Sequence, residues 1–173
     1  LYLAGKTSGT ILTLLGDAVS VLPSLSVIGN LVIGDSSTSS IVLGASGVST
    51  AVSVGGALTA KTADLDIFSD FSVTDAATLT GNGAASILDI KSDSQFTANG
   101  GLTLTGDDLI VAGTVVQSGA ISVDVTGDIQ ISATGALTTT QSANITLLAD
   151  GSLSNTNVVM SAGTLTLGNG ATG

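Results

Sequence analysis

Short runs in which apolar and polar residues alternate recur along the whole 173-residue chain. Each run is ended by Gly, Asp, Asn or Ser, the residues that favour tight turns. Clear examples are residues 25–28, 65–68, 102–105 and 165–167. Because a period of two places successive side chains on opposite faces of a strand, the pattern predicts an all-β chain of very short strands.

The most regular part of the chain is a series of eight-residue units that fills residues 119–158. The third position of every unit is Leu or Ile, and the fourth is polar and uncharged. The third positions are Ile121, Ile129, Leu137, Ile145 and Leu153. Upstream, the same Gly-x-Leu/Ile start recurs without strict spacing at residues 9–11, 29–31, 56–58 and 100–102. We therefore expect one repeat domain over residues 1–173.

A unit of eight residues cannot fold by itself. Burying two aliphatic side chains contributes roughly 3–6 kcal/mol, whereas ordering eight backbone residues costs about 8–16 kcal/mol. A parallel β-solenoid solves this, because each strand pairs with the equivalent strands of the coils above and below. Three units make a coil of about 24 residues and about seven coils in all, which predicts a three-sided parallel β-helix. A two-sided solenoid with about 16 residues per coil fits the spacing equally well, and an antiparallel β-sandwich is the alternative architecture.

The composition excludes several kinds of chemistry. All 13 acidic residues are Asp, all three basic residues are Lys, and the chain has no Glu, Arg, His, Cys or Trp. Histidine catalysis, thiolate nucleophiles, disulfides and zinc sites of Cys or His therefore lack their side chains. The net charge of −10 disfavours nucleic acid as a partner, since phosphate binding depends mainly on Lys and Arg. We attribute the preference for Asp over Glu to corners, where Asp and Asn bond their own backbone in tight turns.

The hydropathy of the chain does not indicate a membrane protein. Mean hydropathy is +0.62, but no apolar run approaches the roughly 18 residues that a membrane-spanning helix requires. We therefore expect no membrane insertion. The chain begins at Leu1 without a basic segment or a starting Met, which is expected of a mature product or a fragment.

One group of Asp residues has the pattern of a metal site. If Leu65 and Ile67 point inward, Asp64 and Asp66 lie on the outer face of one strand, and Asp70 follows shortly after. Hard cations such as calcium prefer oxygen ligands of this kind, so Asp64, Asp66 and Asp70 are our candidate calcium ligands. The alternative interpretation is a solvated acidic face that binds no ion.

Three other features have both a functional and a structural interpretation. Asp107 and Asp108 form the carboxylate pair seen in glycoside hydrolysis, but Gly106 before them favours a corner. Asn144 begins an N-glycosylation triplet and is also expected at a corner. The outward Ser and Thr residues of the repeat are similar to the flat hydroxyl arrays of ice-binding solenoids, but we expect Gln130 to interrupt such an array.

The Gly-x-Leu/Ile-x-aliphatic units, rich in Ser, Thr, Asn and Asp, resemble the repeat shafts of filamentous-haemagglutinin-type exoproteins and related bacterial adhesins. The resemblance is strongest over residues 100–170 and weaker over residues 1–99. The Asn-Pro-containing secretion module of that family has no counterpart here, because the only proline, Pro23, follows Leu22. The resemblance implies a right-handed parallel β-helix and an extracellular or cell-surface location.

We expect a structural role without enzyme activity or a cofactor: an extracellular fibre or shaft segment used for adhesion, a surface coat or a matrix. The alternatives are a polysaccharide-acting β-helix enzyme and an ice-binding or carbohydrate-binding solenoid. The ends of a solenoid expose unpaired strand edges, which isolated proteins cover with polar or charged caps. After Asp150 the sequence carries no charge, and its first 16 residues carry only Lys6. We therefore expect self-association by head-to-tail stacking into filaments, or continuation in a longer chain.

Overall fold

The computed structural model describes residues 2–7, 11–48, 50–155 and 158–168, and these residues form 22 strands and no helix. Face 1 is an eight-stranded sheet of β2 (Ile11–Leu14), β4 (Asn30–Ile33), β7 (Leu58–Thr62), β10 (Ala77–Gly81), β13 (Leu102–Gly106), β16 (Ile121–Val125), β19 (Ile145–Ala149) and β22 (Leu165–Gly168). Face 2 is the column of β5 (Ser40–Leu43), β8 (Asp64–Ile67), β11 (Ile87–Ile90), β14 (Asp108–Val111), β17 (Ile129–Ile131) and β20 (Leu153–Asn155). Face 3 is the column of β6 (Ala51–Val54), β9 (Asp70–Val73), β12 (Gln95–Ala98), β15 (Thr114–Gln117), β18 (Ala136–Ser142) and β21 (Val158–Ala162). The long strand β3 (Ala18–Val27) spans faces 2 and 3, pairs with β1 (Tyr2–Thr7), and joins the two columns into one 14-stranded sheet.

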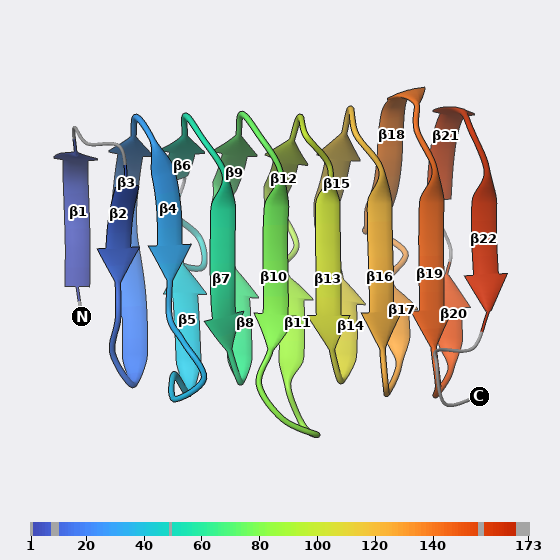
Figure 1. Ribbon diagram of the computed structural model, residues 1–173, viewed down its shortest axis with the longest axis horizontal. Helices are drawn as coiled ribbons and strands as arrows, with labels where there is room; N and C mark the ends of the chain where they lie inside the picture. Colours follow the sequence, from blue (N-terminus) through green and yellow to red (C-terminus); the bar gives the residue numbers. More distant parts are fainter. Residues whose placement is uncertain (1, 8–10, 49, 156–157, 169–173) are drawn as a thin grey trace.

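The strands wind into a right-handed parallel β-solenoid. Each strand named above pairs in parallel with the equivalent strand one coil away, and successive strands visit faces 1, 2 and 3 in turn, over about seven coils. In Figure 1 the strands of face 1 lie in front and point down, the strands behind point up, and the chain advances from left to right. This is the hand that parallel crossover connections adopt almost without exception. The predicted all-β parallel β-helix is confirmed.

The eight-residue repeat corresponds to one side of the coil. Ile121 pairs with Ile145 on face 1, and Ile129 pairs with Leu153 on face 2. Leu137, which follows Ile129 and precedes Ile145 in the series, lies on face 3. Three units therefore complete one coil, which excludes the two-sided solenoid, and the parallel pairing excludes the antiparallel sandwich. Four of the five predicted ladder positions are at most 1% exposed, while Leu153 is only partly buried against the core.

The core consists of ladders of inward-pointing side chains, in which equivalent residues of successive coils lie next to one another. On face 1, Leu58, Leu102 and Ile121 are inward rungs with at most 1% exposure. On face 3, Phe71 and Phe96 are paired rungs whose rings stack with their centroids 5.4 Å apart. Because backbone pairing fixes the rung spacing, each inward side chain packs directly on its equivalent in the next coil.

Coil length varies, although the strand pairs keep their register except for one shift in β1–β3 and one in β18–β21. On face 3 the outward Ser26 and Ser53 are one coil apart and separated by 27 residues, whereas Ala98 and Gln117 are separated by 19. The extra residues lie at corners, such as the long turn between β10 and β11 at the lower edge of Figure 1. The upstream loss of strict spacing is therefore corner variation within one continuous stack.

At some corners Asp forms hydrogen bonds to the next coil, whereas we expected bonds within its own turn. Asp35 does accept the backbone N–H of Ser37 in its own turn, at 2.8 Å. Asp108 and Asp128 instead accept an N–H of the next coil, at 2.7 and 2.6 Å. These corners also require Gly, because an added Cβ at Gly127 would overlap the carboxylate of Asp108. Our prediction of purely local Asp bonds was wrong for these positions, since the short side chain reaches along the solenoid axis to the neighbouring coil.

Candidate functional site

A groove of about 500 Å³ lies at the corner where face 2 turns into face 3. We call it the Lys91 groove. Its lining comes from successive coils, because the corner turns stack directly upon one another. The lining residues are Ser46, Gly47, Val48, Thr50, Phe68, Asp70, Asp89, Lys91, Ser92, Asp93, Ile110 and Ala112.

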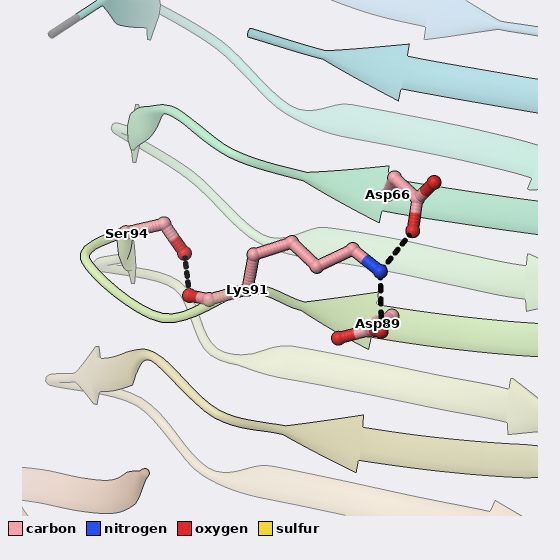
Figure 2. Close-up of polar contacts among 4 residues, drawn as sticks. All are labelled: Asp66, Asp89, Lys91 and Ser94. Carbon is pink, nitrogen blue, oxygen red and sulfur yellow. Dashed lines mark hydrogen bonds and ion pairs between the residues drawn. The ribbon is translucent and has the colours of Figure 1, made fainter. Parts of the chain in front are cut away.

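Lys91 organises the charges on one side of this groove. Asp66 on β8 and Asp89 on β11 are paired rungs of face 2, so their like charges lie one coil apart on the outer surface. Figure 2 shows the Lys91 ammonium between them, with Nζ 2.7 Å from Asp66 Oδ1 and 2.5 Å from Asp89 Oδ2. Burial alone would lower the pKa of Lys91, but the hydrogen bonds and charges of the two carboxylates outweigh it and raise the pKa above 10.5. One cation thus holds two acidic coils together.

The turn after Lys91 has an unusual backbone. The Ser94 hydroxyl donates to the Lys91 carbonyl oxygen at 2.6 Å and closes the turn (Figure 2). Within this turn Asp93 has a φ of 65°, and among the described residues no other non-glycine residue has a positive φ. Asp tolerates this left-handed conformation better than most residues. The conformation sets the course of the turn beside the groove.

Asp89 is paired with Lys91 through Oδ2 only. Its side chain is 15% exposed, and Oδ1 is buried without a hydrogen-bond partner. The Lys91 ammonium also lies 5.5 Å from the centre of the Phe68 ring, within the range of a cation–π contact. The groove therefore combines carboxylates, one ammonium and an aromatic ring within a small hollow.

Two of the three predicted calcium ligands lie on one strand, and the third begins the next strand. Asp64 and Asp66 do point outward from β8, and burial together with the Asp66 charge raises the pKa of Asp64. Asp66 is paired with Lys91, and Asp70 Oδ1 accepts the N–H of Gln95 at 3.1 Å. In the part of the chain that the structure describes, no three acidic side chains are grouped to hold a metal ion. Calcium binding by this trio stays a prediction, and the melting temperature before and after chelation tests it.

Sequence reasoning missed Lys91 as the partner of Asp66. The two residues are distant in sequence but lie one coil apart, so the repeat length was the signal that could have paired them. Phe68, Asp89 and Asp93 were missed for the same reason, because the groove exists only after the coils are stacked.

The other sequence candidates are engaged at corners. Asp107 Oδ1 accepts the Thr126 hydroxyl at 2.8 Å, and Asp108 Oδ1 accepts the N–H of Asp128. Asn144 Oδ1 accepts the N–H of Thr164 at 2.9 Å. These contacts confirm the corner interpretation of the Asp pair and of Asn144.

Face 1 carries a second distinctive surface, a column of outward side chains in which every rung except Val32 is Thr or Ser. The column, which we call the threonine column, runs rung by rung through Thr13, Val32, Thr59, Thr78, Thr103, Ser122, Thr146 and Thr166. Our expectation that Gln130 interrupts the array was wrong, because Gln130 belongs to β17 on face 2. Consecutive units of the repeat occupy three different faces, so only every third unit contributes to one column.

Comparison of the chain with protein-family models, curated proteins and solved structures gives no match. None of the described residues forms a helix that is long and apolar enough to cross a membrane. The structure thus agrees with the β-helical shaft that the family resemblance implies.

Proposed function

We propose that this chain is a segment of a rigid extracellular shaft or fibre of the filamentous-haemagglutinin type, used for adhesion or a surface coat. The unbroken internal ladders support this role. Each coil adds about 4.8 Å, so seven coils make a rod roughly 33 Å long. A rod with continuous hydrogen-bonded columns holds whatever lies at its two ends a fixed distance apart.

The observation that carries the proposal is the exposure of two ladder residues in the last described coil. Leu165 and Leu167 on β22 pair in register with Ile145 and Leu147 on β19. Ile145 and Leu147 are 0% exposed, whereas Leu165 is 42% and Leu167 is 49% exposed. This row has the form of an unfinished ladder, and we propose that a further coil covers it, either from a second copy stacked head to tail or from the continuation of a longer chain.

Electron microscopy and fibre diffraction of the purified chain test the stacking. We expect unbranched fibres with an axial spacing of about 4.7–4.8 Å. Leu165→Lys should prevent them, because a charge would be buried between copies. Thr166→Lys is the matched control, since this neighbour lies in the outward threonine column. A monodisperse monomer at high concentration, or equal behaviour of the two variants, would contradict head-to-tail stacking.

A second candidate function rests on the threonine column. From Thr59 to Thr166 the column repeats its hydroxyls every 4.7–4.9 Å or so, and each hydroxyl both donates and accepts hydrogen bonds. We propose that this column orders water and binds a regular surface such as ice. Thermal hysteresis measures the activity, which Thr103→Lys should abolish and Ser72→Lys, on the outer side of face 3, should leave unchanged. Absence of hysteresis in the unmodified chain would reject this candidate.

A further inference from the structure

We propose that the Lys91 groove binds a saccharide that is neutral or carries an amino group. The proposal goes beyond the shaft function, because it gives the side wall of the rod a ligand of its own. Its volume of about 500 Å³ lies inside the range of about 300–1,000 Å³ typical of small-molecule sites. That space suits a short saccharide segment lying along the corner.

Two independent observations coincide with the hollow. Asp89 Oδ1 is a buried carboxylate oxygen without a partner, and such atoms are rare in folded proteins. Asp93 holds a left-handed backbone conformation, and residues in such conformations cluster at ligand sites. Both residues line the groove, although they belong to different parts of the corner. A hollow, a carboxylate oxygen without a hydrogen-bond partner and a non-glycine residue with positive φ at one place point to a ligand.

The apolar lining supplies contact for the carbon face of a sugar ring. Val48 is 51% exposed, and Phe68, Ile110 and Ala112 are half-buried around the same hollow. A saccharide ring presents C–H groups on its faces and hydroxyls around its edge. Apolar side chains surrounded by a few directed polar groups therefore fit its two kinds of surface.

The polar lining supplies partners for the ring edge. Asp70 and Asp93 are exposed carboxylates that accept hydrogen bonds, and the hydroxyls of Ser46 and Ser92 both donate and accept. The Lys91 ammonium has three hydrogens, of which two are directed at Asp66 and Asp89, so one remains for a ligand oxygen. These groups match a polyhydroxylated ligand.

The charge of the groove restricts the class of saccharide. Asp70, Asp89 and Asp93 line it, while its single ammonium is already shared by Asp66 and Asp89. The net negative charge repels uronic acids and sulfated sugars, whereas an amino group gains from it. A metal ion is a poorer match, because no three acidic groups among the described residues are placed to coordinate one.

Titration calorimetry with three oligosaccharides of equal length tests the proposal. The probes are a glucosamine oligomer, a neutral glucose oligomer and a galacturonic acid oligomer. We expect binding of the first two, with the glucosamine oligomer favoured and weakened by salt, and at least about tenfold weaker binding of the acidic oligomer. No binding of any probe at millimolar concentration, or a preference for the acidic oligomer, would overturn the proposal.

Variants then locate the site on the intact chain. Phe68→Ala removes an apolar wall, and Asp93→Asn removes a charge while keeping a residue type that tolerates positive φ. Each should weaken binding by about tenfold. Asp75→Asn, at an exposed position outside the groove, is the charge-matched control and should not change binding. Equal affinity of all three variants would place the saccharide elsewhere and overturn the assignment, and a monomer without fibres would leave this result unaffected.

Discussion

Residues 119–153 and residues 26–98 build the same three-faced coil with different corners. In the later region Asp128 and Ser152 are joined across one coil at a separation of 24 residues, three units of eight. In the earlier region, separations of 27 and 25 residues occur between equivalent positions, at Ser26–Ser53 and Asp70–Gln95. Strand pairing is parallel and in register in both. The inward ladder is thus the fixed element of the fold, and corner length is free to vary.

This difference also locates the groove. At the corner between faces 2 and 3, the turn from β5 to β6 that contains Val48 is longer than the turn from β17 to β18 in the regular region, whereas the turn from β11 to β12 that contains Asp93 has the same length. Loops carry binding functions more often than the rigid elements that position them. Ladder substitutions should therefore be costly in both regions, whereas corner substitutions that spare the closely packed glycines should be cheap in both.

The largest effect is expected from a charge in the ladder of the regular region. Ile145 is 0% exposed and pairs with Ile121 below and Leu165 above. Ile145→Lys should cost more than about 4 kcal/mol and unfold the repeat, because an ammonium would lie among stacked aliphatics. Circular dichroism during thermal and urea unfolding measures this. Thr146→Lys, one residue away on the outer side, is the control, and a folded Ile145→Lys protein of unchanged stability would refute the inward ladder.

The next largest effect is expected from the aromatic rungs of the irregular region. Phe71 is 1% exposed and stacks on Phe96. Phe71→Ala should destabilise the chain by about 3–5 kcal/mol, through lost burial and an unfilled cavity. Ser72→Ala, on the outward side of the same strand, should change the unfolding free energy by less than about 0.5 kcal/mol. A small effect at Phe71 would mean that the irregular coils are less tightly packed than the regular ones.

The same contrast explains what the sequence predicts. Alternation together with an aliphatic residue at every eighth position is sufficient to place Ile121, Ile129 and Leu137 at inward positions of successive sides, because both signals are local, but the spacing fits two-sided and three-sided coils equally well. The partnership of Asp66 with Lys91 depends on the length of one particular coil, and coil length varies from 19 to 27 residues. An error of one or two residues in corner length moves a side chain to another rung or to another face. The groove could therefore be found only after the coils were stacked.

A smaller effect is expected from the Lys91 corner. Lys91→Met should destabilise by about 1 kcal/mol, since solvent screens this partly exposed ion pair. The folded-state pKa of Lys91 is above 10.5, so the stability that it contributes is present below pH 10.5 and lost as pH rises through the higher folded-state pKa. The melting temperatures of the unmodified chain and of Lys91→Met, measured between about pH 8 and pH 12, should converge at the alkaline end of this range. Lys61→Met, at the outer edge of face 1, is the control, and a difference that persists at all pH values would show that packing of the side chain matters more than its charge.

The smallest effect is expected from an Asp corner of the regular region. Asp128 Oδ1 accepts the Ser152 N–H at 2.6 Å, and this backbone hydrogen bond lowers the pKa of Asp128 below 3.8. The charged carboxylate therefore stabilises the folded chain above pH 3.8, and this contribution is lost as pH falls through the lower folded-state pKa.

Asp128→Asn keeps an oxygen acceptor and removes only the charge. Its melting temperature should be slightly below that of the unmodified chain near neutral pH and equal to it below the folded-state pKa of Asp128. Asp124→Asn, exposed on the outer side of β16, tests whether general charge repulsion contributes, because it removes one negative charge without touching a corner. If both variants raise the melting temperature equally near neutral pH, the net charge of −10 outweighs the hydrogen bond. In that case the oxygen acceptor of Asp, and not its charge, joins the coils at these corners. Asn should then stabilise the corners as well as Asp does.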